Sequence, residues 1–263
     1  MNPLALALWG WLLMAIIQLA LYCYQSARRD ATIVDVGWAL GVGILALIYA
    51  AAGGGDPARR LVLAVLAGFW SGRLASHLFV NRVAKGVEDE RYADLRKRWG
   101  GRAPLYFFFF FQIQAAWSVL FSVPFLVVAF NGKPALSGWT VAAGIAWLTA
   151  VIGESTADRQ LARFRSDPSN RGKACRAGLW RYSRHPNYFF EWIHWWTYVL
   201  LAAGSPYWFV ALWGPAIMLL FLLKITGIPP TEAKAVEALG DEYREYQRTT
   251  SAFVPWFPAK EKR

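Results

Sequence analysis

The sequence places ionisable side chains inside stretches that otherwise carry almost no charge. Arg73 and His77 stand four residues apart in one apolar stretch, and Glu154 and Asp158 have the same spacing in another. A spacing of four puts both members of a pair on one face of a helix. A charge in the bilayer interior costs about 3 kcal/mol or more unless it is paired or hydrated, so each pair is a candidate for ligand binding or proton transfer.

The stretch RYSRHPNYFFEWIHWW, residues 181–196, combines a basic start with a run of aromatic residues that still contains charged and polar side chains. Four polar residues recur here at spacings of four, three and four, which places them on roughly one helix face. They are Asn187, Glu191, His194 and Tyr198. Such a face could bind the polar edge of a ligand in apolar surroundings. For His194, core packing and substrate contact remain equally open.

The elements that must position these residues are membrane helices. The chain has 263 residues, 56% of them hydrophobic, with 15 Trp, 17 Phe and 11 Tyr. Apolar windows of roughly 20 residues recur, and each is long enough to cross a bilayer core. We therefore expect an all-α, polytopic integral membrane protein, one domain over residues 1–263, with about seven transmembrane helices and cytoplasmic interfacial helices. The expected spans are 3–24, 32–52, 60–82, 105–131, 135–157, 186–204 and 206–226, and a cytoplasmic C-terminal helix covers about 230–248.

The distribution of Lys and Arg accounts for the net charge of +11 and predicts an orientation. Residues 82–102 contain seven of them, 159–185 contain eight, and six follow Gly227. Basic loops face the cytoplasm, so the N-terminus is expected outside and the C-terminus inside, in the inner membrane if the host is bacterial. Arg59 and Arg60 fall on the opposite side. We assign the positive charge to topology and expect no nucleic acid partner.

Several standard sites have no support in the sequence. Three histidines without H-x-x-x-H spacing, and two cysteines far apart, do not indicate a metal site or a disulfide framework. GVGILA at 41–46 formally fits a dinucleotide-binding pattern, but it lies inside an apolar span with no strand before it. We expect no metal.

The basic segment 159–185 points to a phosphorylated ligand. Arg side chains bind phosphate oxygens through paired hydrogen bonds, whereas Asn and Glu deeper in the span suit neutral polar groups. A nucleotide with its phosphates at a basic rim and its flat ring one turn inside would fit this gradient. The candidates at the rim include Lys173, Arg184 and His185. The alternative, that basic loops only set topology and contact anionic lipid, remains open.

Two stretches, GLWRYSRHPNYFFEW and GIPPTEAKAVEALGDEYREYQRTTSAFVPWFP, resemble the C-terminal region of the steroid 5-alpha-reductase superfamily. The resemblance is strongest to its bacterial branch, a group of membrane proteins classed as a domain of unknown function. It implies a seven-helix membrane fold that binds NADPH from the cytoplasmic side. It also implies reduction of an activated carbon–carbon double bond in a lipid-soluble substrate, steroid-like or isoprenoid-like. The expected partners are therefore the lipid bilayer and a small hydrophobic substrate.

The resemblance implies roles for particular residues of this chain. Asp158 would meet the adenosine or ribose part of NADPH, and Arg165 would meet a phosphate. Asn187 and Glu191 match the residues that hold the nicotinamide end. Two further matches are Arg73 in the third span and Tyr246 in the C-terminal helix.

On the catalytic side the sequence departs from the steroid reductases. Their Tyr corresponds to Trp70, which has no phenolic proton, and Asp35 is the only carboxylate in the second span. Reduction of a different polarised alkene is therefore expected, with Asp35 as an acid or as an orienting group. This chemistry needs a proton donor and a group that stabilises negative charge on a carbonyl oxygen. The other candidate donors are His77, Tyr188 and Tyr198.

A membrane methyltransferase is the alternative. Isoprenylcysteine and phospholipid methyltransferases, which use S-adenosylmethionine, share the RHPNY turn, a following Glu and a C-terminal helix similar to DEYREY. S-adenosylmethionine carries no phosphate, so the eight basic residues of 159–184 favour NADPH. A non-catalytic lipid-binding protein is a third possibility.

Overall fold

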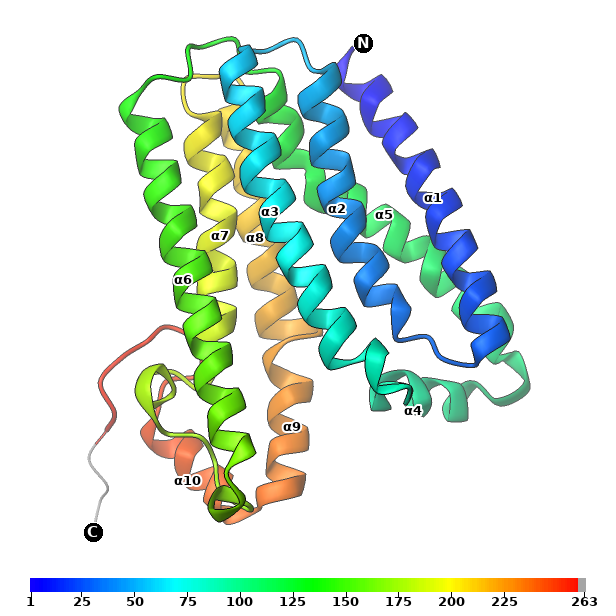
Figure 1. Cartoon of the computed structure of the whole chain (residues 1–263), viewed down its shortest axis with the longest axis vertical. Coiled ribbons are helices and arrows are strands. Elements are labelled where there is room, and N and C mark those ends of the chain that lie inside the picture. The colour runs from blue at the N-terminus through cyan, green and yellow to red at the C-terminus, as the bar shows by residue number, and fades with distance from the viewer. Residues whose placement is uncertain (260–263) are drawn as a thin grey trace. The chain divides into compact units, whose positions relative to one another are not determined.

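The computed structural model describes residues 1–259, and this part of the chain contains helices and loops but no strand (Figure 1). Within it, six helical stretches are long and apolar enough to cross a membrane. Helix α7 (Pro186–Ala202) has 17 residues, which is the lower limit of that length. Each of the seven expected spans coincides with helical structure, and the expected all-α polytopic membrane protein is confirmed.

The chain divides into two compact units. Unit 1 comprises Met1–Ser137 and Leu201–Trp213, and unit 2 comprises Gly138–Leu200 and Gly214–Arg263. The chain crosses from one to the other inside α7, whose last two residues belong to unit 1. The expectation of one domain over the whole chain stays a prediction.

Unit 1 is a bundle of long helices joined by short connections. Its elements are α1 (Pro3–Arg28), α2 (Ile33–Ala52), α3 (Pro57–Asn81), η1 (Val83–Lys85), α4 (Glu90–Trp99), η2 (Gly100–Arg102), α5 (Ala103–Ala129) and η5 (Trp208–Leu212). Helix α2 packs against α1, α3 and α5. The apolar window of α2 is 61% buried, against 22% for α1, so α2 is the central helix of this unit.

Arg59 has a structural role at the start of α3, on the side where the sequence predicts few basic residues. Its guanidinium is buried and donates hydrogen bonds to three backbone carbonyls, those of Lys133, Pro134 and Leu201. Nearby, Asn131 donates to the carbonyls of Leu201, Ala202 and Ala203. The last carbonyls of a helix have no partner within the helix. Arg59 therefore satisfies buried backbone groups at the end of α7.

We expect Arg59→Met to lower the free energy of unfolding by about 2–3 kcal/mol, because buried carbonyls lose a charged donor. Thermal unfolding of the detergent-purified protein measures the effect. Arg60→Met is the matched control, since the half-buried Arg60 donates to the carbonyls of Ala50 and Ala51 and should matter less. A decrease in Tm no larger than that of the control would contradict the capping role.

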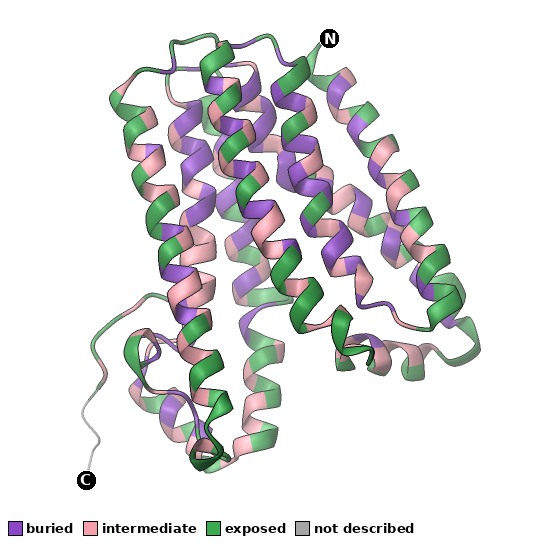
Figure 2. Cartoon of the chain, in the orientation of Figure 1, coloured by how far each residue is buried: buried purple, intermediate pink, exposed green. Residues whose placement is uncertain are grey.

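Unit 2 is built on α6 (Gly138–Ser166) and α7. Its other elements are η3 (Pro168–Asn170), η4 (Gly178–Arg181), α8 (Trp213–Leu220), the π-helical turn η6 (Phe221–Ile225), α9 (Ile228–Leu239) and α10 (Asp241–Thr249). Helix α6 continues beyond its apolar part and stops before Asp167-Pro168. Exposed residues recur along the whole length of α6 (Figure 2).

The predicted C-terminal helix over 230–248 is wrong in one respect, because the structure divides it into α9 and α10. The break is at Gly240, whose φ of 58° and ψ of −128° lie outside the right-handed helical region. The sequence prediction followed the apolar spacing of the two halves across this glycine. Both helices still pack on one apolar cluster. Its members are Ala174, Tyr243 and Tyr246, with Ala235, Val236 and Leu239 against them.

Helix α9 follows the most apolar part of the last candidate span, Trp208–Leu239. The uncharged apolar run after Ser205 ends in η6, where the backbone N–H groups of Thr226 and Gly227 both donate to the carbonyl of Phe221. The helix then restarts with two prolines, and acidic and basic residues follow in its first two turns. We therefore treat Glu232 as a group outside the membrane interior.

Candidate functional site

Polar residues of α6 and α7 meet in unit 2. Asn187 Nδ2 of α7 donates to Asp158 Oδ1 of α6 at 3.3 Å. One turn further along α7, Trp195 Nε1 donates to Glu191 Oε1 at 3.1 Å. The polar seam is defined as Asp158, Asn187, Glu191, His194 and Tyr198. The sequence spacing thus correctly predicts one polar face on α7, and the structure adds its contact with α6.

The deeper end of the polar seam is an imidazole–phenol pair. His194 Nε2 lies 3.0 Å from the hydroxyl oxygen of Tyr198, and both side chains are fully buried. Because either group can carry the shared hydrogen, the pair can hold a proton inside the span. His194 therefore contacts one of the predicted proton donors.

A single carboxylate joins the start of α7 to the C-terminal helices. Glu232 Oε1 of α9 accepts a hydrogen bond of 2.6 Å from Arg184 Nε, and His185 Nε2 lies 3.2 Å from the same oxygen. Its other oxygen accepts from Gln247 Nε2 at 2.8 Å. Arg184 Nη1 also donates to the backbone carbonyls of Gln247 and Thr250. We call this group the Glu232 clasp.

The Glu232 clasp changes the expectation for two predicted cofactor residues. The side chains of Arg184 and His185 are 10% and 4% exposed, and both are turned to Glu232. Their contact with a cofactor phosphate stays a prediction. In the structure they instead hold α7 against α9 and α10.

The Glu232 clasp makes stability depend on pH. Burial works to raise the pKa of Glu232, but hydrogen bonds from His185, Arg184 and Gln247 outweigh it and lower the pKa from 4.5 to about 2. Because the folded pKa is below the unfolded one, this contribution is present above about pH 4.5 and is lost as the pH falls towards 2.

We expect the clasp to contribute about 1–2 kcal/mol that disappears in this acidic window, after allowance for solvent screening. Tm measured as a function of pH checks it. Glu232→Gln should give a shallower decline below pH 4.5 than the unaltered protein, because a Gln has no carboxylate to protonate. Parallel declines would show that Glu232 does not carry the effect.

Tyr246 supports the loop before α7. Its hydroxyl donates to the carbonyl of Trp180 and lies 3.3 Å from that of Ser183, and Arg176 lies over its ring at 5.5 Å. Burial, followed by the charge of Tyr243, raises the pKa of the Tyr246 phenol. The predicted cofactor contact of Tyr246 is untested, and its observed contacts stabilise the fold.

The segment after α10 lies along the same loop. Arg184 N donates to the carbonyl of Ser251 at 2.8 Å, and Trp256 N donates to that of Tyr182 at 2.8 Å. Ser183 Oγ donates to the carbonyl of Phe253 at 2.8 Å. The loop is therefore held by α9, α10 and this segment together.

An exposed set of cations borders the polar seam in sequence. Six Lys and Arg side chains in the last turns of α6 and in the segment between α6 and α7 are exposed, and none of them forms an ion pair within residues 1–259. We define them as the basic rim: Arg159, Arg163, Arg165, Arg171, Lys173 and Arg181. By contrast, Arg176 lies 3.6 Å from both Glu242 and Glu245. The charge of the basic rim is therefore available to an anionic ligand.

Asp35 is the centre of an ionic network in unit 1. Its Oδ2 accepts from Arg82 Nη1 at 2.8 Å and from Arg91 Nη2 at 2.7 Å, and its Oδ1 accepts from the Tyr92 hydroxyl at 2.6 Å. Burial works to raise the pKa of the neighbouring Asp89, but hydrogen bonds and charge from Arg91 outweigh it and lower that pKa. These three donors join Asp35 to Arg82 and to α4, and its predicted role as an acid or an orienting group stays a prediction.

A protein-family model, described as "Protein of unknown function (DUF1295)", matches residues 21–250. The chain belongs to this family. The comparisons with curated proteins and with solved structures gave no match. The expected membership of a family of unknown function is thus confirmed, and the resemblance to steroid 5-alpha-reductases stays a prediction.

In this DUF1295 protein the predicted site residues divide between the two units. Unit 1 contains Asp35, Arg73 and His77. The half-buried Arg73 and the exposed His77 lie on α3, where Asn81 Nδ2 is 3.3 Å from His77 Nδ1. Unit 2 contains the rest, namely Asp158, Arg165, Lys173, Arg184, His185, Asn187, Glu191, Tyr198 and Tyr246.

Two charged residues of this DUF1295 protein with several hydrogen-bond partners were not identified from the sequence. Glu232 was part of an expected interfacial helix, and Arg59 was an exception to the charge pattern. The signal for Glu232 is a carboxylate two residues after Pro229-Pro230, near the start of the helix that follows the last apolar run. For Arg59 the signal is a charge in the first turn of a membrane helix, after the cap residue Asp56.

Proposed function

We propose that this protein is an NADPH-dependent membrane reductase of an activated carbon–carbon double bond in a lipid-soluble substrate. The observation that carries the proposal is a combination within unit 2. An exposed basic rim without an ion pair in residues 1–259 occurs together with a polar seam that is half-buried at Asp158, Asn187 and Glu191 and buried at His194 and Tyr198. A dinucleotide with phosphates has the same gradient, from a strongly anionic part to a neutral ring amide.

The basic rim supplies the chemistry that phosphates require. Arg165 and Lys173 are exposed and carry charge that no carboxylate of the described chain neutralises through an ion pair. Guanidinium and ammonium groups form short, charge-assisted hydrogen bonds to phosphate oxygens. We assign these two residues to the phosphates of the cofactor.

The polar seam suits the uncharged parts of the same cofactor. Asp158 and Asn187 can exchange their mutual hydrogen bond, which is long at 3.3 Å, for bonds to ribose hydroxyls. The carboxylate of Glu191 can accept from a ring amide, as it accepts from Trp195 Nε1. When bound, NADPH supplies a hydride.

A reductase must also provide a proton and keep water away from the reacting carbon. The His194–Tyr198 pair holds a proton in a fully buried position, which satisfies both requirements. In this proposal Tyr198 is the proton donor, and His194 positions the phenol and restores its proton. Arg184, His185 and Tyr246 act indirectly, because they hold the loop that carries α7.

The deciding measurement is cofactor binding to the purified, detergent-solubilised full chain. We expect NADPH to raise Tm and S-adenosylmethionine to leave it unchanged, because only NADPH carries phosphates for the basic rim. Stabilisation by S-adenosylmethionine but not by NADPH would overturn the reductase and favour the methyltransferase.

Glu191→Gln should weaken the stabilisation by NADPH without unfolding the protein. A Gln side chain keeps an oxygen that accepts from Trp195 Nε1, so the fold is retained, but it removes the charge that favours an amide donor. The measurement is the NADPH dependence of Tm. Glu237→Gln, at an exposed position of α9, is the control. An unchanged response would remove Glu191 from the site.

A further inference from the structure

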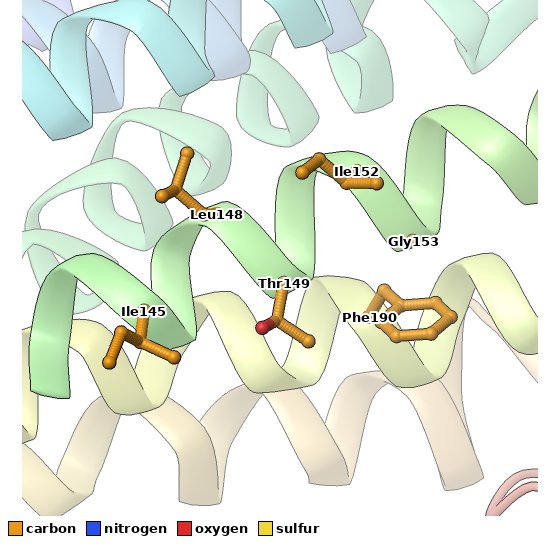
Figure 3. A pocket seen from close by; sticks show the side chains of 6 residues that line it. All are labelled: Ile145, Leu148, Thr149, Ile152, Gly153 and Phe190. Atoms are coloured by element: carbon orange, nitrogen blue, oxygen red, sulfur yellow. The ribbon is translucent and has the colours of Figure 1, made fainter.

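An apolar groove runs along α6 in unit 2, beside α7 (Figure 3). Its volume is about 410 Å³. The lining comes from one stripe of α6 and one ring of α7: Ile145, Leu148, Thr149, Ile152 and Gly153, with Phe190. Since a helix rises 1.5 Å per residue, this stripe is about 12 Å long. The groove is therefore an open one that follows the axis of α6.

Gly153 determines how the groove ends. A Cβ atom at this position would lie only 2.4 Å from Cδ1 of Phe190, so the ring of Phe190 can lie there only because the residue is glycine. Figure 3 shows the Phe190 ring next to Gly153, at one end of the row of α6 side chains. The lining contains a single polar side chain, the hydroxyl of Thr149.

The position of the groove in the chain decides what can fill it. It lies in the uncharged stretch from Pro134 to Gly153, which belongs to a helix apolar enough to cross a membrane. The side chains of Ile145 and Ile152 are 60% and 61% exposed. A water molecule in the groove would find one hydroxyl and would need two to four polar partners. The apolar lining of the groove is therefore suited to a hydrocarbon chain.

Two features favour one lipid chain over general contact with the bilayer. The ring of Phe190 stands beside Gly153 at one end of the stripe, so a flexible chain lying along α6 meets an aromatic ring there. In addition, this end immediately precedes Glu154 and Glu191 in sequence. A chain in the groove therefore ends at the level of the polar seam.

We propose that this groove binds the linear hydrocarbon chain of a lipid, and that this lipid is the substrate, with its polar, reactive end directed to the polar seam. This inference rests on the proposed reductase and specifies its substrate class: an acyl or isoprenoid chain rather than a rigid fused-ring compound.

The test uses the full chain in lipid nanodiscs and a fatty acid that carries a diazirine in its chain. After illumination, mass spectrometry maps the labelled residues. We expect several-fold more label at residues 145–152 than at Val141, which is equally exposed on the same helix but outside the groove. Excess unlabelled oleic acid or farnesol should compete with the label, and cholesterol should not.

Two substitutions by tryptophan complete the test. Thr149→Trp fills the groove and should reduce labelling there several-fold, whereas Val141→Trp adds the same side chain outside it and should leave labelling unchanged. Equal label on all exposed positions of α6 would reduce the groove to ordinary bilayer contact and overturn the proposal. Cross-links between two copies through this face would assign it to self-association instead.

The failure of this inference can be separated from the failure of the proposed function. Thr149→Trp should keep the stabilisation by NADPH, because the groove contains none of the proposed cofactor residues. If NADPH binds but the label is spread evenly, the groove does not bind the lipid chain. The proposed reductase function is then unaffected. If the label is confined to the groove but NADPH does not bind, the lipid site stands and the reductase is wrong.

Discussion

Arg184→Gln is expected to lower the free energy of unfolding by about 3–5 kcal/mol, the usual cost of removing one partner from a buried ion pair. The Glu232 carboxylate would keep its charge and lose its shortest hydrogen bond, 2.6 Å from Arg184 Nε. The carbonyls of Gln247 and Thr250 would lose the same donor. In a unit of this size Tm should fall by roughly 10 °C. Thermal unfolding in detergent, without any cofactor, is the measurement.

Two further variants make this result specific. Arg181→Gln removes an exposed charge from the same loop and should change stability by no more than about 0.5 kcal/mol. Arg184→Met combined with Glu232→Leu should recover much of the loss, because an apolar pair can replace a buried ion pair. If Arg184→Gln keeps its Tm but loses the response to NADPH, Arg184 is a cofactor ligand and the structural role is wrong.

The membrane helices were predictable from sequence because their signal is local. Each span needs about 20 apolar residues in a row, and no distant contact can remove that requirement. The α7 face was predictable for the same reason, since spacings of four, three and four fix the positions of its polar residues on any helix. A polar helix face in a bilayer must pack against other polar groups of the protein, and the contact of Asn187 with Asp158 meets this requirement.

The hydrogen-bond partners of Arg184 and Asp35 were not predictable, because they are distant in sequence. An Arg before a helix looks the same whether it binds a phosphate or a carboxylate 48 positions later, such as Glu232. Likewise, Asp35 was a candidate acid because it is alone in its span, but Arg91 and Tyr92 reach it from α4. In both cases the tertiary fold supplies the counter-charge that the sequence shows only as one of many charged surface residues.

Long-range pairing involves only part of the basic segment 159–185. Of its eight cations, Arg184 and Arg176 form ion pairs with acidic residues of α9 and α10, and the other six form no ion pair in the part of the chain that the structure describes. Only Arg176 and Arg184 therefore have an ion pair that stabilises the fold. The remaining charge repels itself on the surface, which an anionic ligand would relieve.

The second large effect is expected on binding. The double variant Arg165→Gln/Lys173→Gln should weaken the affinity for NADPH about 10–100-fold, because two charge-assisted hydrogen bonds to phosphate are together worth about 1.5–3 kcal/mol. Tm without ligand should stay within about 2 °C of the unaltered protein, since both side chains are exposed and have no ion pair to lose. Titration of Tm, or of intrinsic fluorescence, with NADPH measures the change.

The control must separate a local phosphate contact from the general loss of positive charge. Lys97→Gln/Arg98→Gln removes the same two charges from an exposed turn of α4 in unit 1. Because the proposed phosphate contacts belong to unit 2, this variant should bind NADPH normally. Equal weakening in both double variants would mean that NADPH responds to net charge alone. Normal binding by the Arg165→Gln/Lys173→Gln variant would exclude these two residues of the basic rim as the phosphate site and remove the main support for a phosphorylated cofactor.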